Sequence, residues 1–396
     1  MTSVHPRVLL DGGQYVGVLA AVRALRAAGY EPWVATSEPD SYGGRSRAAA
    51  GVVVLPDPGF DDNRFARSLA RAAARISAAV VLPGTERGLI ALSRGVAEFP
   101  AGVAVGVCPP ATVALATDKT LLHQLARAAG LDVPATRVLS AAEVAESPPD
   151  VSYPAVVKPQ RSELPTSLGE LEHFAVTRVK SREELHAALL ALPGACGVVQ
   201  PYIDGRLGAT AGVFWDGEIV CAAHMAAERT WPPGCGTVSY GRTVAPDPEF
   251  DLAIGSLLER LGWRGIFQVD YIERDGRRLV IDLNPRIYTW LTLAVAAGRN
   301  LPAVWTALLL GREPEIGRYK CGVRYRHEPY DGRALMSAFR GGARAAALTG
   351  LLPRPRTAHA VVSLRDPMPA LTALESAATW MRSRRAMARA DARTAL

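Results

Sequence analysis

Lysine is scarce in this sequence. Of its 45 basic residues only four are lysine, Lys119, Lys158, Lys180 and Lys320, so arginine is the ordinary cation of the chain. The position of each lysine is therefore informative. Lys158 ends a short apolar strand that starts at Tyr153, which favours an ammonium group that faces an anion. The alternative is a lysine that only extends its amine to water from the end of a strand.

Cysteine is also rare, and long apolar runs are missing. The five cysteines are odd in number and include no CxxC pair, which argues against a disulfide framework or a zinc site: Cys108, Cys196, Cys221, Cys235 and Cys321. No apolar run is long enough to span a bilayer. The first apolar run meets Asp11 after a few residues, so we expect no signal peptide. These features predict a cytoplasmic protein with reduced thiols and no membrane partner.

Acidic residues are scarce near the C-terminus. From Asp331 to the end, eleven arginines stand against four acids, which gives +7 and equals the net charge of the whole chain. A basic segment can bind nucleic acid. Here aromatic residues do not alternate with the arginines, so the sequence does not favour a nucleic-acid partner. Such binding would be steeply salt-dependent.

The chain of 396 residues, 49% of them hydrophobic, has room for two or three domains. In residues 1–112, strands alternate with helices, which predicts a Rossmann-like parallel α/β layer. The expected strands lie at 7–11, 33–35, 52–55, 79–83 and 103–108. The run from Gly12 to Gly17 is a near match to the dinucleotide fingerprint, but we predict no NAD site there. We expect a core domain at 113–311 and a small Arg- and Ala-rich domain at 312–396, with one strand at 360–364. The sequence is compatible with a homodimer.

Residues 265–286 predict two strands around a turn. Side chains two apart on a strand share a face, so Asp282, Asn284 and Arg286 point the same way. A three-residue turn centred on Gly276 would place Asp270 opposite Asp282. Two carboxylates and an amide oxygen on one face suit Mg²⁺. The alternative is a solvated hairpin with scattered acids.

Three further segments carry predictions. Asp118 is a candidate N-cap for a helix that ends near Gly130. Residues 229–239 are rich in Pro and Gly, which predicts a mobile or functional loop. Residues 291–310 look helical and apolar, and Gly311 is a plausible C-terminal stop. Cys235 lies in the predicted loop, but no base is near it in sequence, so a spare thiol is favoured over a nucleophile.

The order of these segments resembles the ATP-grasp superfamily. The matching motifs, which span roughly residues 5–310, are Asp118-Lys119 at a helix start, the strand 153–158, the segment 199–205, Gln268-Val-Asp270, and the segment 281–286. Two of the four lysines fall on the two lysine positions of this family. The resemblance is nearest to ATP-dependent carboxylate–amine ligases. It implies an α+β core in two parts that follows the N-terminal α/β domain.

The resemblance also implies roles for individual residues. Lys119 and Lys158 would contact ATP phosphates. The adenine hinge would be Gln200, Pro201, Tyr202 and Ile203, with Asp204 as the ribose candidate. Asp270, Asp282 and Asn284 would hold one or two Mg²⁺ ions, with Mn²⁺ as a substitute. The sequence departs from the family at Asp282, where a Glu is usual, and in the loop after Lys158, which leaves Arg161 and Ser162 as candidate phosphate contacts.

Other implied roles concern the reaction and its substrate. Arg286 would stabilise charge on the transferred phosphoryl group or the tetrahedral intermediate. Arg229 and the glycine-rich loop, with Gly236, would close over the γ-phosphate and the acyl group, and His224 would lie at the base of that loop. Glu86 follows a strand of the first domain and would contact substrate; a residue in a helix N-cap is the alternative there. Trp290 would line the substrate site or pack on the next helix.

The expected function is an ATP- and Mg²⁺-dependent ligase that activates a small carboxylate as an acyl phosphate and joins it to an amine. The alternatives are an ATP-grasp enzyme with another acceptor, such as a carboxylase, a carbamoyl-phosphate synthase-like enzyme or a kinase, and a nucleotide-binding protein without ligase activity. The metal residues argue against the last of these, because a decayed site would have lost them.

Overall fold

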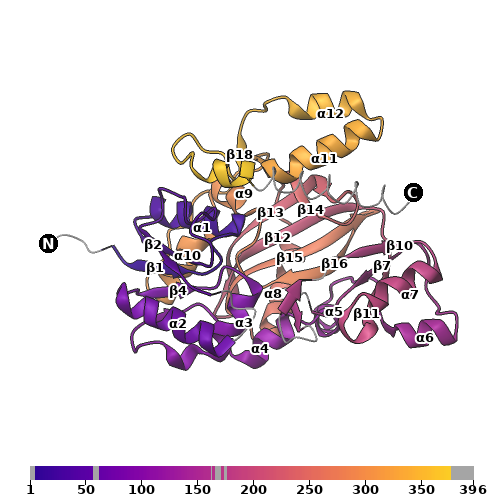
Figure 1. Ribbon diagram of the computed structural model, residues 1–396, viewed down its shortest axis with the longest axis horizontal. Coiled ribbons are helices and arrows are strands. Elements are labelled where there is room, and N and C mark those ends of the chain that lie inside the picture. Colours follow the sequence, from indigo (N-terminus) through magenta and orange to yellow (C-terminus); the bar gives the residue numbers. More distant parts are fainter. Residues whose placement is uncertain (1–4, 57–61, 162, 166–170, 174–175, 376–396) are drawn as a thin grey trace, which may run out of the picture.

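Three layers of sheet organise the molecule, as the computed structural model in Figure 1 shows. The structure describes residues 5–56, 62–161, 163–165, 171–173 and 176–375. A five-stranded sheet forms the N-terminal part, a four-stranded sheet lies at the opposite end, and a seven-stranded sheet runs between them. This is a mixed α/β architecture, as the sequence predicts.

The N-terminal sheet is parallel, with strand order β3-β2-β1-β4-β5. Its strands are β1 (Arg7–Leu10), β2 (Glu31–Thr36), β3 (Gly51–Val54), β4 (Val80–Leu82) and β5 (Ala104–Val105), and its helices are α1 (Val16–Ala27), α2 (Asp62–Arg75), α3 (Glu86–Arg94) and the 3-10 turn η2 (Val96–Glu98). Gly12 has a φ of +78°, and a Cβ there would lie 2.5 Å from the Thr85 side chain. The glycine turn therefore serves close packing of the chain.

Asp11 directly follows β1, and its side chain is buried. Its carboxylate accepts hydrogen bonds from the Gly84 amide at 2.6 Å and from the Thr85 hydroxyl at 2.8 Å. Burial nevertheless dominates and raises the pKa of Asp11 to about 6. Since the folded pKa lies above that of the unfolded chain, the folded state binds more protons between about pH 4 and pH 6, and stability falls as the pH rises through that window.

Asp11→Asn is expected to remove this pH dependence. The Asn oxygen can accept from Gly84, and its amide can donate to the Thr85 hydroxyl, so the packing is kept. The stability of the variant relative to the parent should rise by up to about 3 kcal/mol between pH 4 and pH 7. Urea unfolding at the two pH values measures this. Asp40→Asn, at an exposed carboxylate, is the matched control, and parallel pH curves for Asp11→Asn and the parent would contradict the assignment.

The seven-stranded sheet has the order β16-β15-β12-β13-β14-β17-β18. Its strands are β12 (Arg206–Trp215), β13 (Glu218–Trp231), β14 (Thr237–Thr243), β15 (Gly265–Arg274), β16 (Arg277–Asn284), β17 (Arg324–Arg326) and β18 (Thr357–His359). The strand predicted at 360–364 is wrong, because the pairing with β17 uses the three residues before it. β17 pairs with β14, so the segment after residue 312 extends this sheet. The domain boundaries remain a prediction.

The four-stranded sheet is antiparallel, with the order β10-β7-β11-β6. It consists of β6 (Arg137–Ser140), β7 (Ala155–Lys158), β10 (Thr177–Val179) and β11 (Cys196–Pro201), with α6 (Ala141–Glu146), α7 (Arg182–Leu190), the 3-10 turn η3 (Pro193–Ala195) and the strand pair β8 (Glu163–Pro165) and β9 (Leu171–His173). The helices that link the layers are α4 (Pro110–Ala116), α5 (Lys119–Ala128) and α8 (Pro248–Leu261). α5 packs on β16 and α8, and Asp118 caps it as predicted, by accepting from the amides of Thr120 and Leu121.

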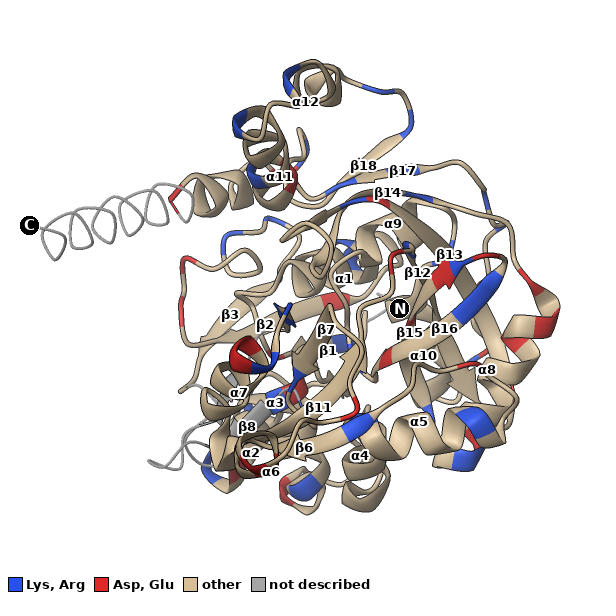
Figure 2. Ribbon diagram, turned by 90° about the vertical axis from the view of Figure 1, so that its right-hand side faces the viewer, with Lys and Arg blue, Asp and Glu red and all other residues tan. Residues whose placement is uncertain are grey.

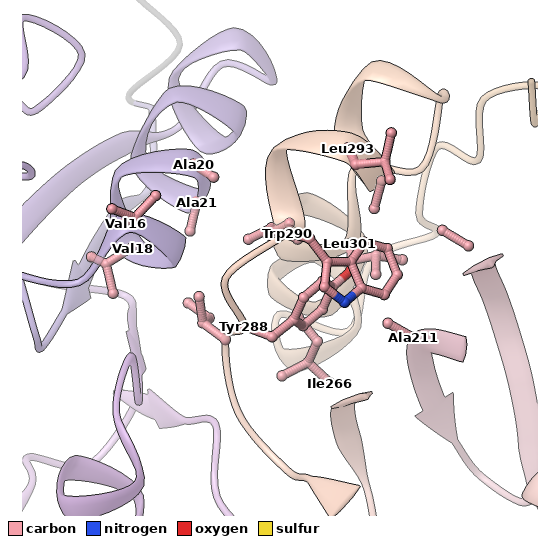
Figure 3. Close-up of a cluster of buried hydrophobic side chains, with 14 of the residues drawn as sticks. Val16, Val18, Ala20, Ala21, Ala211, Ile266, Tyr288, Trp290, Leu293 and Leu301 are labelled. Carbon is pink, nitrogen blue, oxygen red and sulfur yellow. The ribbon is translucent and has the colours of Figure 1, made fainter. Parts of the chain in front are cut away.

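The segment 291–310 is helical, as predicted, but it is divided into two helices. The structure has α9 (Leu291–Ala296) and α10 (Leu301–Leu309). Gly298 breaks the run with a φ of +91°, and a Cβ there would meet the Arg318 carbonyl at 2.4 Å. The break lets α1 pack against both α9 and α10. Figure 3 shows Val16, Ala20 and Ala21 of α1 facing the cluster around Trp290, which joins the N-terminal layer to the seven-stranded sheet.

Two helices of the C-terminal part, α11 (Glu328–Arg340) and α12 (Arg344–Leu351), pack on each other. α11 lies over β13 and β14. Within the described residues no helix has the length and apolarity needed to cross a membrane. All five cysteines carry free thiols.

Candidate active site

The β15–β16 hairpin brings two carboxylates face to face. Asp270 pairs with Asp282, as predicted. The predicted three-residue turn is wrong, however, because Arg274 pairs with Arg277 across a two-residue turn at Asp275-Gly276. Both turn residues have positive φ, 52° and 75°, as a type I′ turn requires. A β-bulge next to Asp270 then shifts the register by one residue and restores the predicted pairing.

The bulge has a second consequence. Ile281 is the extra residue on β16, and a bulged residue is left out of the ladder. Its carbonyl accepts a hydrogen bond from Lys158 Nζ at 2.9 Å. Burial first, with a smaller contribution from Lys119, lowers the pKa of Lys158 to about 8, although Asp282 and Asp270 oppose the change. Lys158 therefore faces anions, as its place at the end of β7 predicts.

Lys119 is the first residue of α5 and is buried. Its Nζ lies 3.6 Å from Asp282 Oδ1. The amides at the start of this helix are already bonded, that of Lys119 to the Gln160 carbonyl and those of Thr120 and Leu121 to Asp118, so the anion-facing group here is the Lys119 side chain. Asp118, which caps this helix, accepts from Gln160 Nε2 at 2.9 Å and lies 3.7 Å from Arg161 Nη2. Ser162 lies outside the described residues.

The carboxylate pair has the character of a cation site. Burial first, and then repulsion from Asp282, raise the pKa of Asp270 to about 7. Asp270 accepts from Gln268 Nε2 at 2.5 Å and from Asn284 Nδ2 at 3.0 Å. The described residues contain no group of three His, Cys, Asp or Glu side chains placed to bind a metal. Two carboxylates fit Mg²⁺, which binds few protein oxygens and keeps phosphate or water ligands.

Asn284 bridges this pair to Arg286. The Asn284 oxygen accepts from Arg286 Nη2 at 3.1 Å, so its NH₂ group faces Asp270. The Asn284 oxygen could coordinate a cation only if the side-chain amide rotated so that its oxygen and nitrogen exchanged places. Arg286 Nη1 also lies 3.4 Å from the Tyr15 hydroxyl. Burial lowers the pKa of Arg286, but Tyr15, Glu86 and Asp282 raise it and prevail. Glu86, at the start of α3, is therefore close enough to act on this guanidinium, while the helix cap is Thr85.

Tyr15 is a site residue that the sequence did not single out. It lies in the turn between β1 and α1, and its hydroxyl is 2.7 Å from Thr289 Oγ1. Its place in the glycine-rich turn after β1 was the only signal for it in the sequence, because the side chains of such a turn contact other parts of the molecule. Gln268 was part of a quoted motif, but its contact with Asp270 was not predicted.

A cavity of about 940 Å³ joins these groups between the four-stranded and seven-stranded sheets. It is lined by the metal and phosphate candidates Lys158, Asp270, Asp282, Asn284 and Arg286, by the hinge residues Gln200, Pro201, Tyr202, Ile203 and Asp204, by Arg229 and Gly236, and by Tyr15, Val156, Ile272, Ile281 and Trp290 among others. Lys119 borders it through its contact with Asp282. Most predicted site residues therefore surround one space.

The hinge segment lies at one end of this cavity. Gln200 is buried, and its Nε2 contacts Thr136 Oγ1 at 2.8 Å and His123 Nδ1 at 3.3 Å. The Tyr202 amide donates to the Pro154 carbonyl, and the Arg178 guanidinium lies 3.8 Å from the centre of the Tyr202 ring. The hinge backbone is thus fixed on both sides.

The glycine-rich loop is shorter than predicted. β13 continues to Trp231 and β14 begins at Thr237, so the loop spans only residues 232–236. It bounds the cavity through Gly234, Cys235 and Gly236. A Cβ at Gly236 would lie 2.0 to 2.2 Å from backbone atoms of Trp231 and Pro232, a distance at which the loop cannot keep its shape.

Gly236→Ala is therefore expected to displace the loop and to lower kcat/KM for ATP by at least about tenfold, since misplacement by an ångström near a reacting centre costs up to about a hundredfold. Steady-state turnover measures this. Gly255→Ala is the matched control, because no atom lies within 4 Å of a Cβ on that α8 glycine. Unchanged kinetics for Gly236→Ala would show that the loop does not shape the site.

Two predicted residues are placed differently from expectation. Arg229 lies on β13 and not in a loop, and its Nε and Nη2 bind Asp331 at 2.8 and 3.1 Å. His224 does not line the cavity. It is buried, with Nδ1 3.2 Å from Thr210 Oγ1 and Nε2 3.5 Å from Asp251, and burial lowers its pKa to about 4. His224 thus lies in a buried cluster behind the cavity lining.

No protein-family model matches this chain, and no curated protein matches it by sequence. Solved structures do. An L-amino acid ligase from Bacillus licheniformis superposes with a TM-score of 0.58 and 17% identity, over 80% of this chain and 76% of that one. An N5-carboxyaminoimidazole ribonucleotide synthetase in complex with ADP gives a TM-score of 0.61 and 15% identity, over 87% and 88%.

A third similar structure is the biotin carboxylase domain of the Hydrogenobacter thermophilus 2-oxoglutarate carboxylase, with MgADP and bicarbonate. Its TM-score is 0.57 at 12% identity, over 80% of this chain and 73% of that one. The three superpositions share a single fold. The protein has the ATP-grasp fold. The cavity of this ATP-grasp chain lies between its four-stranded and seven-stranded sheets, and the N-terminal parallel layer reaches it through Tyr15.

Proposed function

We propose that this protein is an ATP- and Mg²⁺-dependent ligase that activates a small-molecule carboxylate as an acyl phosphate and joins it to an amine. The products are an amide or peptide bond, ADP and phosphate. One observation carries the proposal: Lys119, Lys158 and Arg286 surround the facing carboxylates of Asp270 and Asp282 at one cavity. Phosphoryl transfer depends on such positioning and charge neutralisation and needs no protein nucleophile. The ADP and MgADP in two similar structures support a nucleotide at this place.

The residues present fit one divalent cation. Asp270 and Asp282 would hold it, and Asn284 would join them after its amide turned over. The raised pKa of Asp270 supports this, because two facing, partly buried carboxylates repel each other unless a positive charge lies close to both. When bound, Mg²⁺ neutralises charge on the phosphate oxygens.

The hinge end of the cavity suits the nucleotide base. Val156, Ile272 and Ile281 give it apolar walls, and the backbone of residues 201–203 supplies the polar edge. Lys158 lies between this end and the carboxylate pair, since it contacts the Ile281 carbonyl. A nucleotide that runs from the hinge to Lys119 and Lys158 would direct its γ-phosphate toward Arg286.

The reaction then proceeds in two steps. An oxygen of the substrate carboxylate bonds to the γ-phosphorus while the bond to the bridging oxygen of ADP breaks, and Arg286 stabilises the charge on the transferred group. The amine nitrogen next bonds to the acyl carbon, phosphate leaves with the bonding electrons, and the nitrogen loses its proton to water. Loop 232–236 keeps other water away from the acyl phosphate.

The test is ADP release with Mg-ATP across a panel of carboxylic acids, with and without a panel of amines. Release stimulated by an acid alone indicates acyl-phosphate formation. Product formation that requires both partners, with one phosphate for each amide, is the expected result. Absence of stimulation by every acid–amine pair would count against the ligase class.

A further inference from the structure

The cavity continues past the phosphate-binding residues to a wall formed by α11. Ala334 and Ala338 of this helix line the cavity, and Asp331, one turn before Ala334, is buried. These positions share one face of the helix, the face that packs toward β13 and β14. Figure 2 shows α11 beside β14 and β17. We define the α11 recess as the part of the cavity bounded by Ala334, Ala338, Ala227, Val238 and Arg229.

The recess has an excess of positive charge. Asp331 binds Arg229 through two hydrogen bonds, and the same carboxylate lies 3.2 Å from Arg326 Nε. Two guanidinium groups thus share one carboxylate, which leaves one net positive charge. The Tyr240 ring lies 4.3 Å from the Arg229 guanidinium and 5.5 Å from that of Arg326. Arg229 is therefore held in place, and a fixed arginine fork suits a carboxylate ligand.

The other cations of the cavity have partners that account for their charge. Among the described residues that line it, the basic ones are Lys158, Arg206, Arg229 and Arg286. Lys158 and Arg286 face the carboxylate pair of the phosphate site. Arg206 binds Glu273 through both carboxylate oxygens at 3.0 Å, one charge against one. Arg229 shares its partner with Arg326, so it is the cation that can neutralise a further anion.

The recess adjoins the reaction centre. Arg286 contacts the Tyr15 hydroxyl. Thr289 contacts the Tyr15 hydroxyl at 2.7 Å and accepts from the hydroxyl of Tyr325 at 3.0 Å, and Tyr325 lies on β17, the strand that directly precedes α11. The start of α11 is thus beside the residue that contacts Arg286, and the helix runs from there along the recess. Apart from Arg229, the residues that define the recess are Ala and Val.

We propose that the α11 recess binds the amine substrate as an amino acid with an apolar side chain, whose unreacting carboxylate binds Arg229 and whose side chain packs on Ala334 and Ala338. The proposal rests on the proposed ligase function, because it assigns the second substrate of that reaction. An amino acid that attacks through its amine keeps a free carboxylate, and this group needs a cation that the phosphates do not occupy. Small residues on α11 leave room for the side chain.

The test compares amino acids with their amides. With any carboxylic acid that supports turnover, L-leucine and L-leucinamide, and glycine and glycinamide, are assayed as amines in the parent and in Arg229→Gln. Arg229→Gln leaves Asp331 paired with Arg326, so the fold is kept. KM for leucine should rise about 10- to 100-fold in the variant, as expected for loss of a charge-assisted hydrogen bond, while KM for leucinamide changes less than about threefold.

Two further variants complete the design. Arg242→Gln is the matched control, since Arg242 pairs with Glu228 on the neighbouring strand and does not line the cavity; it should leave both KM values unchanged. Ala338→Leu fills the recess and should lower kcat/KM for leucine at least about tenfold relative to glycine. Melting temperatures of the three variants confirm that each is folded.

Three results would overturn the assignment. The first is that the parent has the same KM for amino acids as for their amides. The second is a rise in KM for leucine and leucinamide by the same factor in Arg229→Gln. The third is a rise in KM for ATP alone in that variant, which would place Arg229 on the nucleotide. If no acid–amine pair supports turnover in the parent, the ligase function itself fails, and this outcome is distinct from the other three.

Discussion

Asp282→Asn is expected to abolish ligase turnover and to leave the protein folded. The variant removes one of the two facing carboxylates, so a divalent cation loses an anionic ligand and the phosphates lose its charge neutralisation. Removing one electrostatic contact to developing charge costs about 100- to 1000-fold in kcat, and loss of the metal should reach or exceed the upper end of that range. ADP release over a Mg²⁺ titration measures the effect.

The fold should tolerate this change for an electrostatic reason. Asp282 raises the pKa of Asp270 by repulsion, so its neutral isostere relieves a buried like-charge contact, while Lys119 and Lys158 lose one favourable partner. The pair is only partly buried, the two effects oppose each other, and the melting temperature should stay close to that of the parent. Asp275→Asn is the matched control, at the exposed turn of the same hairpin where Asn accepts a positive φ. Full activity of Asp282→Asn would remove the metal assignment.

Arg286→Gln is expected to lower kcat by about 100- to 1000-fold with a much smaller change in KM for ATP. The guanidinium is partly buried, stays charged through Tyr15, Glu86 and Asp282, and donates to the Asn284 side-chain oxygen. Its charge would be used when the phosphoryl group moves, so the loss should appear in kcat. Lysine should recover little, because a single ammonium cannot replace the planar fork.

Arg274→Gln is the control for this second variant. It lies on the same hairpin, is half-exposed, and pairs only with the adjacent Asp275 among the described contacts. Single-turnover measurements at saturating Mg-ATP separate the chemical step from binding. One result would assign Arg286 to ground-state binding instead. In that result KM for ATP rises equally in Arg286→Gln and in a phosphate-contact variant such as Lys158→Gln, and kcat is not lost.

The hairpin illustrates how far local sequence reasoning reaches. Alternation along a strand is a property of the backbone, so the common face of Asp282 and Asn284 followed from spacing alone. The turn was predicted with one residue too many. The bulge at Ile281 compensated for that error, and the carbonyl of the bulged residue bonds Lys158, 123 positions away, a contact that no local pattern encodes.

The placements of Arg229 and His224 show the same contrast between local sequence pattern and tertiary contact. Both lie near a Pro- and Gly-rich segment, which predicted a loop that begins at Arg229. β14 instead pairs with β13 as far as Trp231, and Asp331, which lies 102 positions further on, fixes the guanidinium. His224 has its partners on β12 and α8, in Thr210 and Asp251. Strand pairing and helix docking decided both placements.

By itself, the sequence determined the succession of strands and helices, the shared face of Asp282 and Asn284, and the two lysines that stand out in a chain whose ordinary cation is arginine. These depend on the local geometry of the chain and on residue chemistry. Only the tertiary structure decided that Tyr15 reaches Arg286 from the first layer, that Arg326 and Arg229 share Asp331, and that α11 closes one side of the cavity. Such contacts join residues up to 271 positions apart, and they form because apolar faces pack together, which brings side chains with no common local pattern into one site.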